Sequence, residues 1–267
     1  MGSAFARAFL SADLCSPSSL LVIEPMDDKR EFLRESVGCS VSSGLDKSVH
    51  DCAIIFLAVK PAEAADVCAR LRPLLSPRQL VISMMAGVRS QDLIRALGGH
   101  RLVVRCMPNT PAQCAAGMTV FFSPASLDTV QRDAVETLLQ STGACLEVGQ
   151  EPLLDAATAI SGSGPAYIFY IIEHYVKAAQ ELGFSTDEAE FLVAQTIVGT
   201  LGLWTSTGEQ PAELRQRVTS KGGTTAAALE TFEEHAIGSA LRDGIHRAFE
   251  RCMELATSLR AESRQTE

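Results

Sequence analysis

Short apolar runs alternate with longer, mixed stretches through the first 150 residues of the chain. Continuous apolar runs of this length are typical of strands buried on both faces of a parallel sheet. Helices are predicted between them, over Ala62–Arg72, Ser90–Leu97 and Ser126–Gln140. The alternation predicts a doubly wound parallel α/β sheet. The strands are expected at Leu20–Glu24, Ala53–Val59, Leu80–Met84, Leu102–Cys106, Met118–Phe122 and Cys145–Val148.

The strand pattern stops near Glu151, and every later element is predicted to be a helix. We therefore expect a dinucleotide-binding domain over residues 1–150 and a helical domain over residues 151–267. Proline near a helix start, a Ser-Thr-Asp-Glu capping box and glycine after a helix end mark the boundaries. The boundary residues are Pro165 and Gly183 for the first helix, Ser185 and Gly208 for the second, and Pro211 for the start of a short third. The last helix is predicted over Ala226–Leu259, broken or continuous around Gly238.

The predicted helices are apolar over much of their circumference, above all in Ala166–Ile172 and Phe191–Trp204. One small bundle has too little interior to cover so much apolar surface. We therefore expect the helical domain to pair subunits into a homodimer or a larger homo-oligomer.

Composition narrows the class of protein. The 267 residues are 46% hydrophobic and 21% charged, which excludes a disordered or collagen-like chain. A net charge of −9 disfavours nucleic acid or an anionic membrane as a partner. The longest apolar run, Ala166–Ile172, is too short for a membrane span, and the first residues lack the basic region of a signal peptide. We expect a soluble, cytoplasmic protein.

The metal- and sulfur-bearing residues show no site pattern. The eight cysteines form no C-x-x-C pair and several lie in apolar runs, which predicts reduced core thiols rather than disulfides. The five histidines lack any H-E-x-x-H spacing, so no metal site is predicted.

Rigid or polar turns follow three successive predicted strands: Ala58–Pro61, Met85–Gly87 and Met107–Pro111. In an open parallel sheet, ligands bind outside the carboxyl ends of the strands. Taken alone, the first two turns are better explained as ordinary strand ends, and a plain connecting loop explains the prolines of the third equally well. Three in succession favour a cofactor crevice.

The segment Ser220–Thr225 (S-K-G-G-T-T) directly precedes an alanine-rich helix. The backbone N–H groups of Gly223, Thr224 and Thr225 are expected to be unpaired there, and such a helix start binds a carboxylate or phosphate. A flexible loop with a threonine N-cap is the alternative that the pattern leaves open.

Taken together, four segments resemble the pyrroline-5-carboxylate reductase family: FLAVKP (56–61), RCMPNTPA (105–112), ISGSGPAY (160–167) and VTSKGGTT (218–225). The resemblance runs from Met1 to about Leu259. It implies a Rossmann-like domain followed by an all-helical domain through which subunits pair. It also implies reduction of the C=N bond of Δ1-pyrroline-5-carboxylate to L-proline by NADH or NADPH, the last step of proline biosynthesis.

The resemblance further implies roles for single residues. Thr225 would place its hydroxyl against the ring nitrogen, Ser220, Gly223 and Thr224 would hold the carboxylate, and Glu151 matches a position near the substrate. The substrate loop would come from the partner subunit, so that the site is shared. Cofactor contacts carry over to Met1, Gly2, Ala58, Val59, Lys60, Pro61, Met85, Ala86, Gly87 and, more loosely, Asn109.

Two departures from the family concern the cofactor. The G-x-G-x-x-G fingerprint and its strand are absent before Met1-Gly2, so either the sequence begins late, which we favour because the later motifs are intact, or the cofactor binds poorly. Without that strand, Leu20–Glu24 and Leu80–Met84 should lack a neighbour. Glu24 stands where the family often has Ser, Asn or Arg, and a carboxylate suits a free ribose 2′-hydroxyl rather than a phosphate. A solvated glutamate is the alternative.

Two rival functions stay open. A β-hydroxyacid dehydrogenase would need a catalytic lysine in the second domain, and Lys177 is the only lysine of that domain's first helix, with no matching motif around it. The other rival is a non-catalytic oligomeric relative with an impaired cofactor loop.

Overall fold

The computed structural model describes the backbone of residues 1–265 and the side chains of residues 1–254, so the last two residues of the predicted helical domain lie outside it. The chain forms two compact units. The first comprises residues 1–163 and the C-terminal segment that begins at Ala248, and the second comprises Gly164–Arg247. Residues 151–163 therefore pack with the sheet, although the strand pattern has already ended there.

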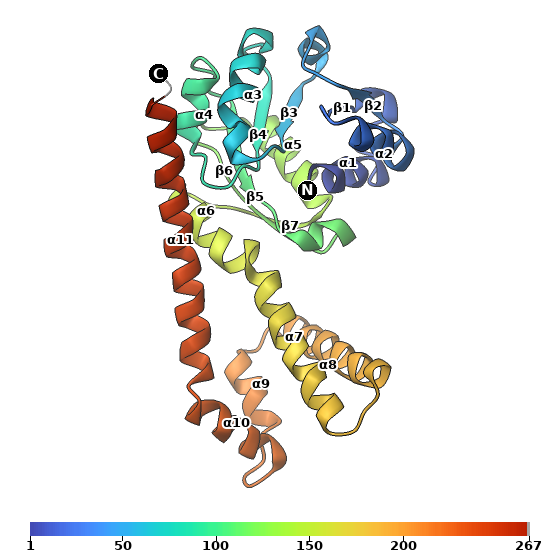
Figure 1. Ribbon diagram of the computed structural model, residues 1–267, viewed down its shortest axis with the longest axis vertical. Coiled ribbons are helices and arrows are strands. Elements are labelled where there is room, and N and C mark those ends of the chain that lie inside the picture. Colours follow the sequence, from blue (N-terminus) through green and yellow to red (C-terminus); the bar gives the residue numbers. More distant parts are fainter. Residues whose placement is uncertain (266–267) are drawn as a thin grey trace. The chain divides into compact units, whose positions relative to one another are not determined.

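The first unit contains a five-stranded sheet of order β3-β4-β5-β6-β7 and a separate two-stranded sheet, β1-β2 (Figure 1). All six predicted strands are present. The sequence pattern missed β2, whose S-V-S segment has a single apolar residue. The strands are β1 (Leu21–Ile23), β2 (Ser40–Ser42), β3 (Ile54–Leu57), β4 (Leu80–Ser83), β5 (Val103–Met107), β6 (Gly117–Phe122) and β7 (Gly143–Glu147).

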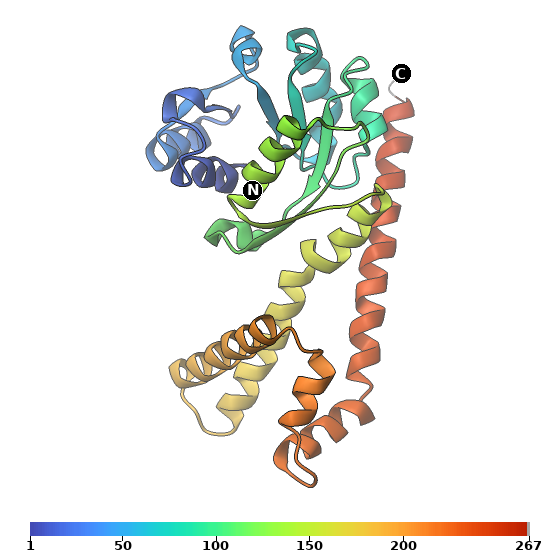
Figure 2. The ribbon, with the colours of Figure 1, turned by 180° about the vertical axis from the view of Figure 1, so that it is seen from behind.

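Helices cover both faces of the larger sheet, as the doubly wound prediction requires (Figure 2). Alternate residues of β4 point to opposite faces, so Leu80 and Ile82 join one core cluster and Val81 joins the other. The first cluster lies beneath α1 (Gly2–Ser11) and α5 (Thr129–Gln140), and the second lies beneath α3 (Ala64–Leu71) and α4 (Ser90–Ala96). Apart from short 3₁₀ turns and the C-terminal segment, this unit also contains α2 (Asp27–Val37), α6 (Pro152–Ala157) and the π-helix Thr158–Gly162 that continues α6.

The sheet is parallel except at one pair. Strands β3, β4 and β5 run parallel, β6 is antiparallel to β5, and β7 is parallel to β6. Only residues 108–116 link β5 to β6, and they contain a single 3₁₀ turn. A parallel crossover needs a dozen residues or more, so a link this short returns the chain antiparallel.

One expectation about strand neighbours is wrong. Strand β4, at Leu80–Ser83, lies between β3 and β5, so it has neighbours on both sides. Within the five-stranded sheet, two strands have a single neighbour: β3 pairs with β4 alone, and β7 pairs with β6 alone. Strand β1 likewise pairs only with β2 within the described residues. Strand β3 is an edge strand of the larger sheet because, among the described strands, only β4 pairs with it; β1 and β2 form a sheet of their own.

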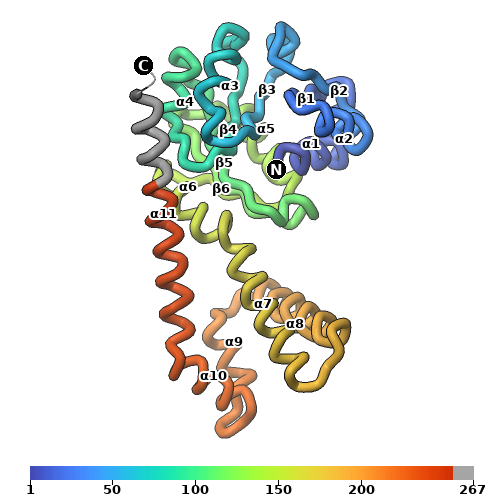
Figure 3. Tube along the Cα trace, viewed as in Figure 1, coloured from blue at the N-terminus to red at the C-terminus, as the bar shows by residue number. Residues whose placement is uncertain are grey.

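The second unit is entirely helical within its described residues, as predicted. Its first two helices form an antiparallel pair joined by a short loop (Figure 3). The Ser185–Glu188 capping box is present, with Ser185 N donating to Glu188 Oε2 at 2.9 Å, and Gly208 ends the second helix with a φ of 66°. The helices are α7 (Gly164–Glu181), α8 (Thr186–Thr207), α9 (Pro211–Arg217), α10 (Thr224–Glu234) and α11 (Ile237–Gln265, which continues into the first unit).

The last predicted helix is broken near Gly238, one of the two alternatives that the sequence leaves open. The break comes at His235–Ala236, where Ala236 has a φ of 51° and so leaves the right-handed helical conformation. No helix among the described residues combines the length and apolarity needed to cross a bilayer.

Candidate active site

The three predicted cofactor turns lie at one edge of the sheet. Because β3, β4 and β5 are adjacent and parallel, the turns Ala58–Pro61, Met85–Gly87 and Met107–Pro111 follow the same ends of neighbouring strands. Gly87 has a φ of 74°, a conformation that residues with a side chain rarely adopt. Met85 is buried in the core, so its side chain anchors this turn and does not line the edge.

The start of α1 lies against the end of β3. A Cβ built on Gly2 would lie 3.0 Å from Ala58 Cβ, so the two backbones approach closely and a larger residue would push them apart. The first turn of α1 carries no acidic side chain. A helix start of this kind, with unpaired N–H groups and a positive dipole end, suits a diphosphate. The residues around Met1 and Gly2 therefore fit a dinucleotide.

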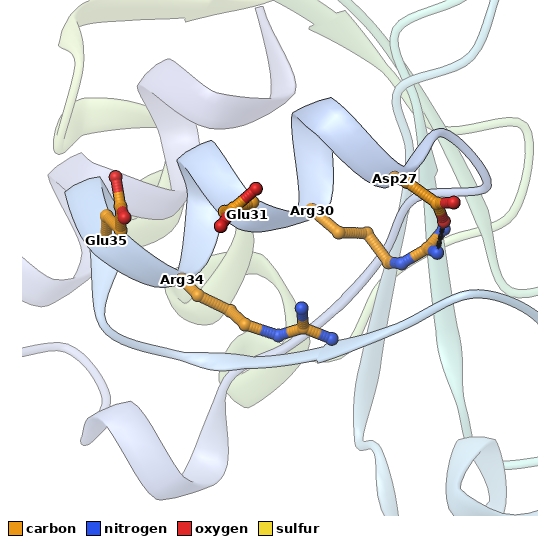
Figure 4. A pocket seen from close by; sticks show the side chains of 5 residues that line it. All are labelled: Asp27, Arg30, Glu31, Arg34 and Glu35. Carbon is orange, nitrogen blue, oxygen red and sulfur yellow. Dashed lines mark hydrogen bonds and ion pairs between the residues drawn. The ribbon is translucent and has the colours of Figure 1, made fainter.

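Carboxylates gather where β1 ends and α2 begins. Glu24 Oε1 accepts a hydrogen bond from Met26 N at 3.0 Å, and Asp27 and Asp28 stand in the first turn of α2. The nearby guanidinium of Arg30 is already engaged, because its Nη1 donates to the backbone oxygens of Glu24 (2.9 Å) and Pro25 (2.6 Å). Arg30 also pairs with Asp27 (Figure 4).

The pocket drawn in Figure 4 belongs to the charged surface of α2. None of the predicted site residues lines it; its lining consists of Asp27, Arg30, Glu31, Arg34 and Glu35. Arg30 pairs with Asp27, and the pocket brings acids and bases together without a single prevailing charge, so we assign it no ligand. The end of β1 thus presents negative charge with no free arginine shown beside Glu24, which suits a hydroxyl better than a phosphate.

The side chain of Asn109 joins three segments. Its Nδ2 donates to Ser161 O at 2.9 Å, and its Oδ1 accepts from Met118 N at 2.8 Å. A Cβ on Gly162 would meet Met107 Cε at 3.0 Å, so the π-helix packs directly against the end of β5. The M-P-N-T-P turn is therefore held in place by β6 and by the S-G-S-G segment.

Glu151, expected near the substrate, makes three hydrogen bonds within the first unit. Its Oε1 accepts from Ser90 N (2.7 Å) and from Arg105 Nη1 (2.6 Å), and its Oε2 accepts from Ser90 Oγ (2.8 Å). Burial favours the neutral acid, but the hydrogen bonds from Ser90 and Arg105 outweigh it and hold the pKa of Glu151 below its ordinary value. Glu151 is thus a carboxylate at neutral pH.

A second buried carboxylate lies beside this group. Asp155 is 2% exposed, and each of its oxygens lies 3.9 Å from a guanidinium, Oδ1 from Arg105 and Oδ2 from Arg89. The sequence analysis missed these charged partners. The available signal was Arg105 itself, an arginine inside the apolar strand L-V-V-R-C, which a buried strand tolerates only with an acid nearby.

The candidate substrate loop, Ser220–Thr225, belongs to the second unit. One expectation about it is wrong: the N–H of Gly223 is not unpaired, because it donates to Ser220 O at 3.0 Å. Gly223 is instead the N-cap of α10, so the N–H groups facing out of the helix start are those of Thr224, Thr225 and Ala226. A Cβ on Gly223 would lie 2.5 Å from Ser220 Oγ and 3.2 Å from Ser220 O, so a larger residue here would force the Ser220 side chain to move.

The cysteines of the described part of the chain form no metal site, and two of the buried ones are unreactive. All eight cysteines are free thiols, and burial raises the pKa of Cys106 to about 12 and that of Cys68 to about 11. Both thiols therefore stay protonated and unreactive at neutral pH. Among the described residues, no group of His, Cys, Asp and Glu is arranged to hold a metal ion.

Comparisons with known families divide the chain in two. Residues 151–255 match the family described as pyrroline-5-carboxylate reductase dimerisation, and residues 1–87 match the family described as NADP oxidoreductase, coenzyme F420-dependent. The pyrroline-5-carboxylate reductase of Pseudomonas aeruginosa is 36% identical, over 88% of this chain and 86% of its own length. The Escherichia coli reductase is 33% identical, over 97% of this chain and 96% of its own length.

Solved structures agree with these sequence matches. A pyrroline-5-carboxylate reductase of Coxiella burnetii superposes with a TM-score of 0.83 at 32% identity, covering 96% of this chain and 93% of its own. A pyrroline carboxylate reductase of Plasmodium falciparum, solved with NADP bound, gives a TM-score of 0.87 at 28% identity over 96% and 94% of the two chains. The similarity thus includes both the sheet and the helices.

Proposed function

Because the chain belongs to the pyrroline-5-carboxylate reductase family, we propose that the loops described above carry out the family's reaction, reduction of a cyclic imine to proline. The chain is an oxidoreductase that reduces Δ1-pyrroline-5-carboxylate with NAD(P)H. The observation that carries this conclusion is identity of 33% extending over 97% of the chain, so that both the cofactor half and the substrate half are included.

We propose that the cofactor lies along the sheet edge. The turns Ala58–Pro61 and Met85–Gly87 would contact it through their backbones, Asn109 would hold the third turn in place, and the start of α1 at Met1 and Gly2 would face its phosphates. When bound, the dihydronicotinamide supplies the hydride. This domain assignment, residues 1–150 for the cofactor and 151–267 for substrate and dimerisation, is part of the proposal.

The start of α10 is proposed to bind the substrate. The N–H groups at Thr224 and Thr225 and the exposed hydroxyl of Ser220 would bind the carboxylate, while Gly223 gives the loop its shape. The Thr225 hydroxyl would donate to the ring nitrogen, which draws electron density from the C=N carbon and makes it more electrophilic. This loop would be supplied by the partner subunit.

Turnover of the purified chain tests the proposal against its rivals. We expect NAD(P)H oxidation that depends on Δ1-pyrroline-5-carboxylate. A β-hydroxyacid dehydrogenase would instead oxidise a 3-hydroxyacid with NAD(P)⁺, and a scaffold protein would bind neither dinucleotide. Exposed Lys177 on α7 tests the first rival directly, since Lys177→Ala should leave reduction of the imine unchanged.

Glu24 is proposed to set the cofactor preference. Its carboxylate and the acids that follow it oppose a 2′-phosphate, so NADH should have the higher kcat/KM. Glu24→Ser should reduce the NADH-to-NADPH ratio of kcat/KM by about tenfold, on the order of 1.4 kcal/mol. Steady-state kinetics with both cofactors measures the ratio. Glu35→Gln, a loss of charge further along α2, should leave it unchanged; a wild-type preference for NADPH would mean that Glu24 points to solvent.

Subunit pairing is proposed to use the apolar faces of α7 and α8. Phe169 is 65% exposed and Phe191 72% exposed within the single chain. Exposed aromatic surface of this extent is typical of a protein–protein interface. Phe191→Lys should weaken self-association at least about tenfold, because a desolvated ammonium replaces an aromatic contact. Light scattering across a dilution series measures this. Val130→Lys, at an exposed valine of the first unit, is the matched control, and equal association of Phe191→Lys and wild type would place the interface elsewhere.

We further propose that the reaction takes place in the cytoplasm, with no nucleic acid or membrane as partner. Free thiols at all eight cysteines support a reducing compartment.

A further inference from the structure

A buried polar cluster lies beneath the sheet edge, and the proposed chemistry does not use it. Arg105 is 4% exposed and Ser90 1% exposed, yet both donate to the carboxylate of Glu151. A buried ion pair contributes little net stability, because desolvating the two charges offsets most of their attraction. The cluster therefore needs an explanation other than stability.

The cluster connects the bases of two cofactor turns. Ser90 begins α4 shortly after the Met85–Gly87 turn, and Arg105 precedes the Met107–Pro111 turn in β5. Glu151 comes from a third segment, just before α6, and one of its oxygens accepts from both Ser90 N and Arg105 Nη1. A single oxygen atom thus fixes the separation between the start of α4 and strand β5.

The charge of Glu151 also suits the start of α4. The Ser90 N–H is one of the donors that a helix start leaves without an internal acceptor, and a carboxylate there is favoured by the helix dipole. With three donors within 2.8 Å, three of the roughly four acceptor positions of the carboxylate are occupied, two of them on Oε1. A direct bond to a substrate would be confined to the remaining position, on Oε2.

We propose that Glu151 is a positioning residue for the cofactor: through Ser90 and Arg105 it holds the Met85–Gly87 and Met107–Pro111 turns at the spacing that NAD(P)H requires. This rests on the proposed cofactor site and replaces, for Glu151, direct contact with the substrate. Loss of the carboxylate then weakens binding of the dinucleotide. At saturating cofactor, kcat stays close to the wild-type value.

The test compares Glu151→Gln with Ser90→Ala, the double variant and Asp133→Asn, which removes one exposed charge from α5 of the same unit. Cofactor Kd is measured by fluorescence titration with NADH and NADPH without substrate. Steady-state kinetics then give kcat and the KM for Δ1-pyrroline-5-carboxylate, and a thermal scan monitors folding. We expect Glu151→Gln to raise the cofactor Kd at least about tenfold, with kcat and substrate KM within about twofold of wild type. The double variant should lose less than the two single losses combined, because both act through one contact.

Unchanged cofactor Kd overturns the proposal, and a raised substrate KM beside it would assign Glu151 to the substrate. Ser90→Ala keeps both charges and removes one hydroxyl, so it carries the test if Glu151→Gln does not fold: a Kd raised about threefold is expected, and an unchanged one overturns the proposal. If the wild-type chain binds the dinucleotide but does not reduce the imine, the proposed function is wrong. The proposal for Glu151 is then still decided by the cofactor Kd, because the Kd is measured without substrate. A wild type that binds neither dinucleotide overturns both.

Discussion

Thr225→Ala should lower kcat at least about tenfold and leave the Kd for NAD(P)H unchanged. Thr225 occupies the second position of α10, beside N–H groups suited to a carboxylate, and its hydroxyl is the group proposed to polarise the imine nitrogen. A hydrogen bond that strengthens as the nitrogen gains basicity stabilises the transition state more than the bound substrate. Losing it costs on the order of 1.4 kcal/mol or more in the barrier.

Two companion variants separate the hydroxyl from the helix. Thr225→Ser keeps the hydroxyl and should retain most of kcat. Thr231→Ala removes an exposed threonine from the same helix, whose hydroxyl donates only to Ala227 O at 3.2 Å, and should have no effect on turnover. Single-turnover kinetics at saturating cofactor measures the chemical step. A Thr225→Ala enzyme with wild-type kcat would remove this residue from the mechanism.

Arg105→Met should lower the free energy of unfolding by about 3 kcal/mol at neutral pH. The substitution keeps an unbranched side chain in β5 but leaves the Glu151 carboxylate, 2.6 Å from Arg105 in the native chain, without its cation in a buried site. Breaking one partner out of a buried pair is more costly than the pair is favourable, because the remaining charge stays desolvated. Urea unfolding at a fixed protein concentration measures the loss.

The sign of its pH dependence follows from Glu151. The folded-state pKa of this carboxyl is lowered, so the stability it contributes is present above the ordinary value of 4.5 and is lost as the pH falls through the folded pKa. The gap between wild type and Arg105→Met should therefore narrow below pH 4.5. Arg95→Met, which removes an exposed arginine paired with Asp92, should cost less than about 1 kcal/mol. A pH-independent gap would attribute the loss to packing in β5.

The sequence predicted best the elements whose local pattern agrees with their environment. Strand β4 is apolar at Leu80, Val81 and Ile82 and is buried on both faces, so its hydrophobic run and its place in the sheet have the same cause. The capping box at Ser185 and the glycine at Gly208 are local hydrogen-bonding and conformational signals, and they marked the ends of α8 correctly. Helix α2 escaped prediction because Leu33 is its single buried residue, so it shows no apolar face.

Within the candidate site, the turns at Ala58 and Met85 were predictable. Short motifs mark where the strands end, and adjacent parallel strands end on the same side of a sheet. Glu151 was found only through family resemblance. Its contacts with Ser90 and Arg105 join residues 61 and 46 positions away, and no local pattern encodes a hydrogen bond across such distances. The error at Gly223 has a different, local cause: the motif does not show which residue is the N-cap, and the turn that precedes α10 pairs the Gly223 N–H with Ser220 O three residues away.

By itself, then, the sequence determined six of the seven described strands, most of the longer helices, the change to an all-helical second half and the family, because hydrophobic period, caps and motifs are properties of consecutive residues. Tertiary structure alone decided that β3 is an edge strand, that β6 returns antiparallel to β5, and that Glu151 faces Ser90 and Arg105. These outcomes depend on which distant segments form hydrogen bonds with one another and together exclude water. They are decided by the whole fold because each buried polar group that is left unpaired costs free energy.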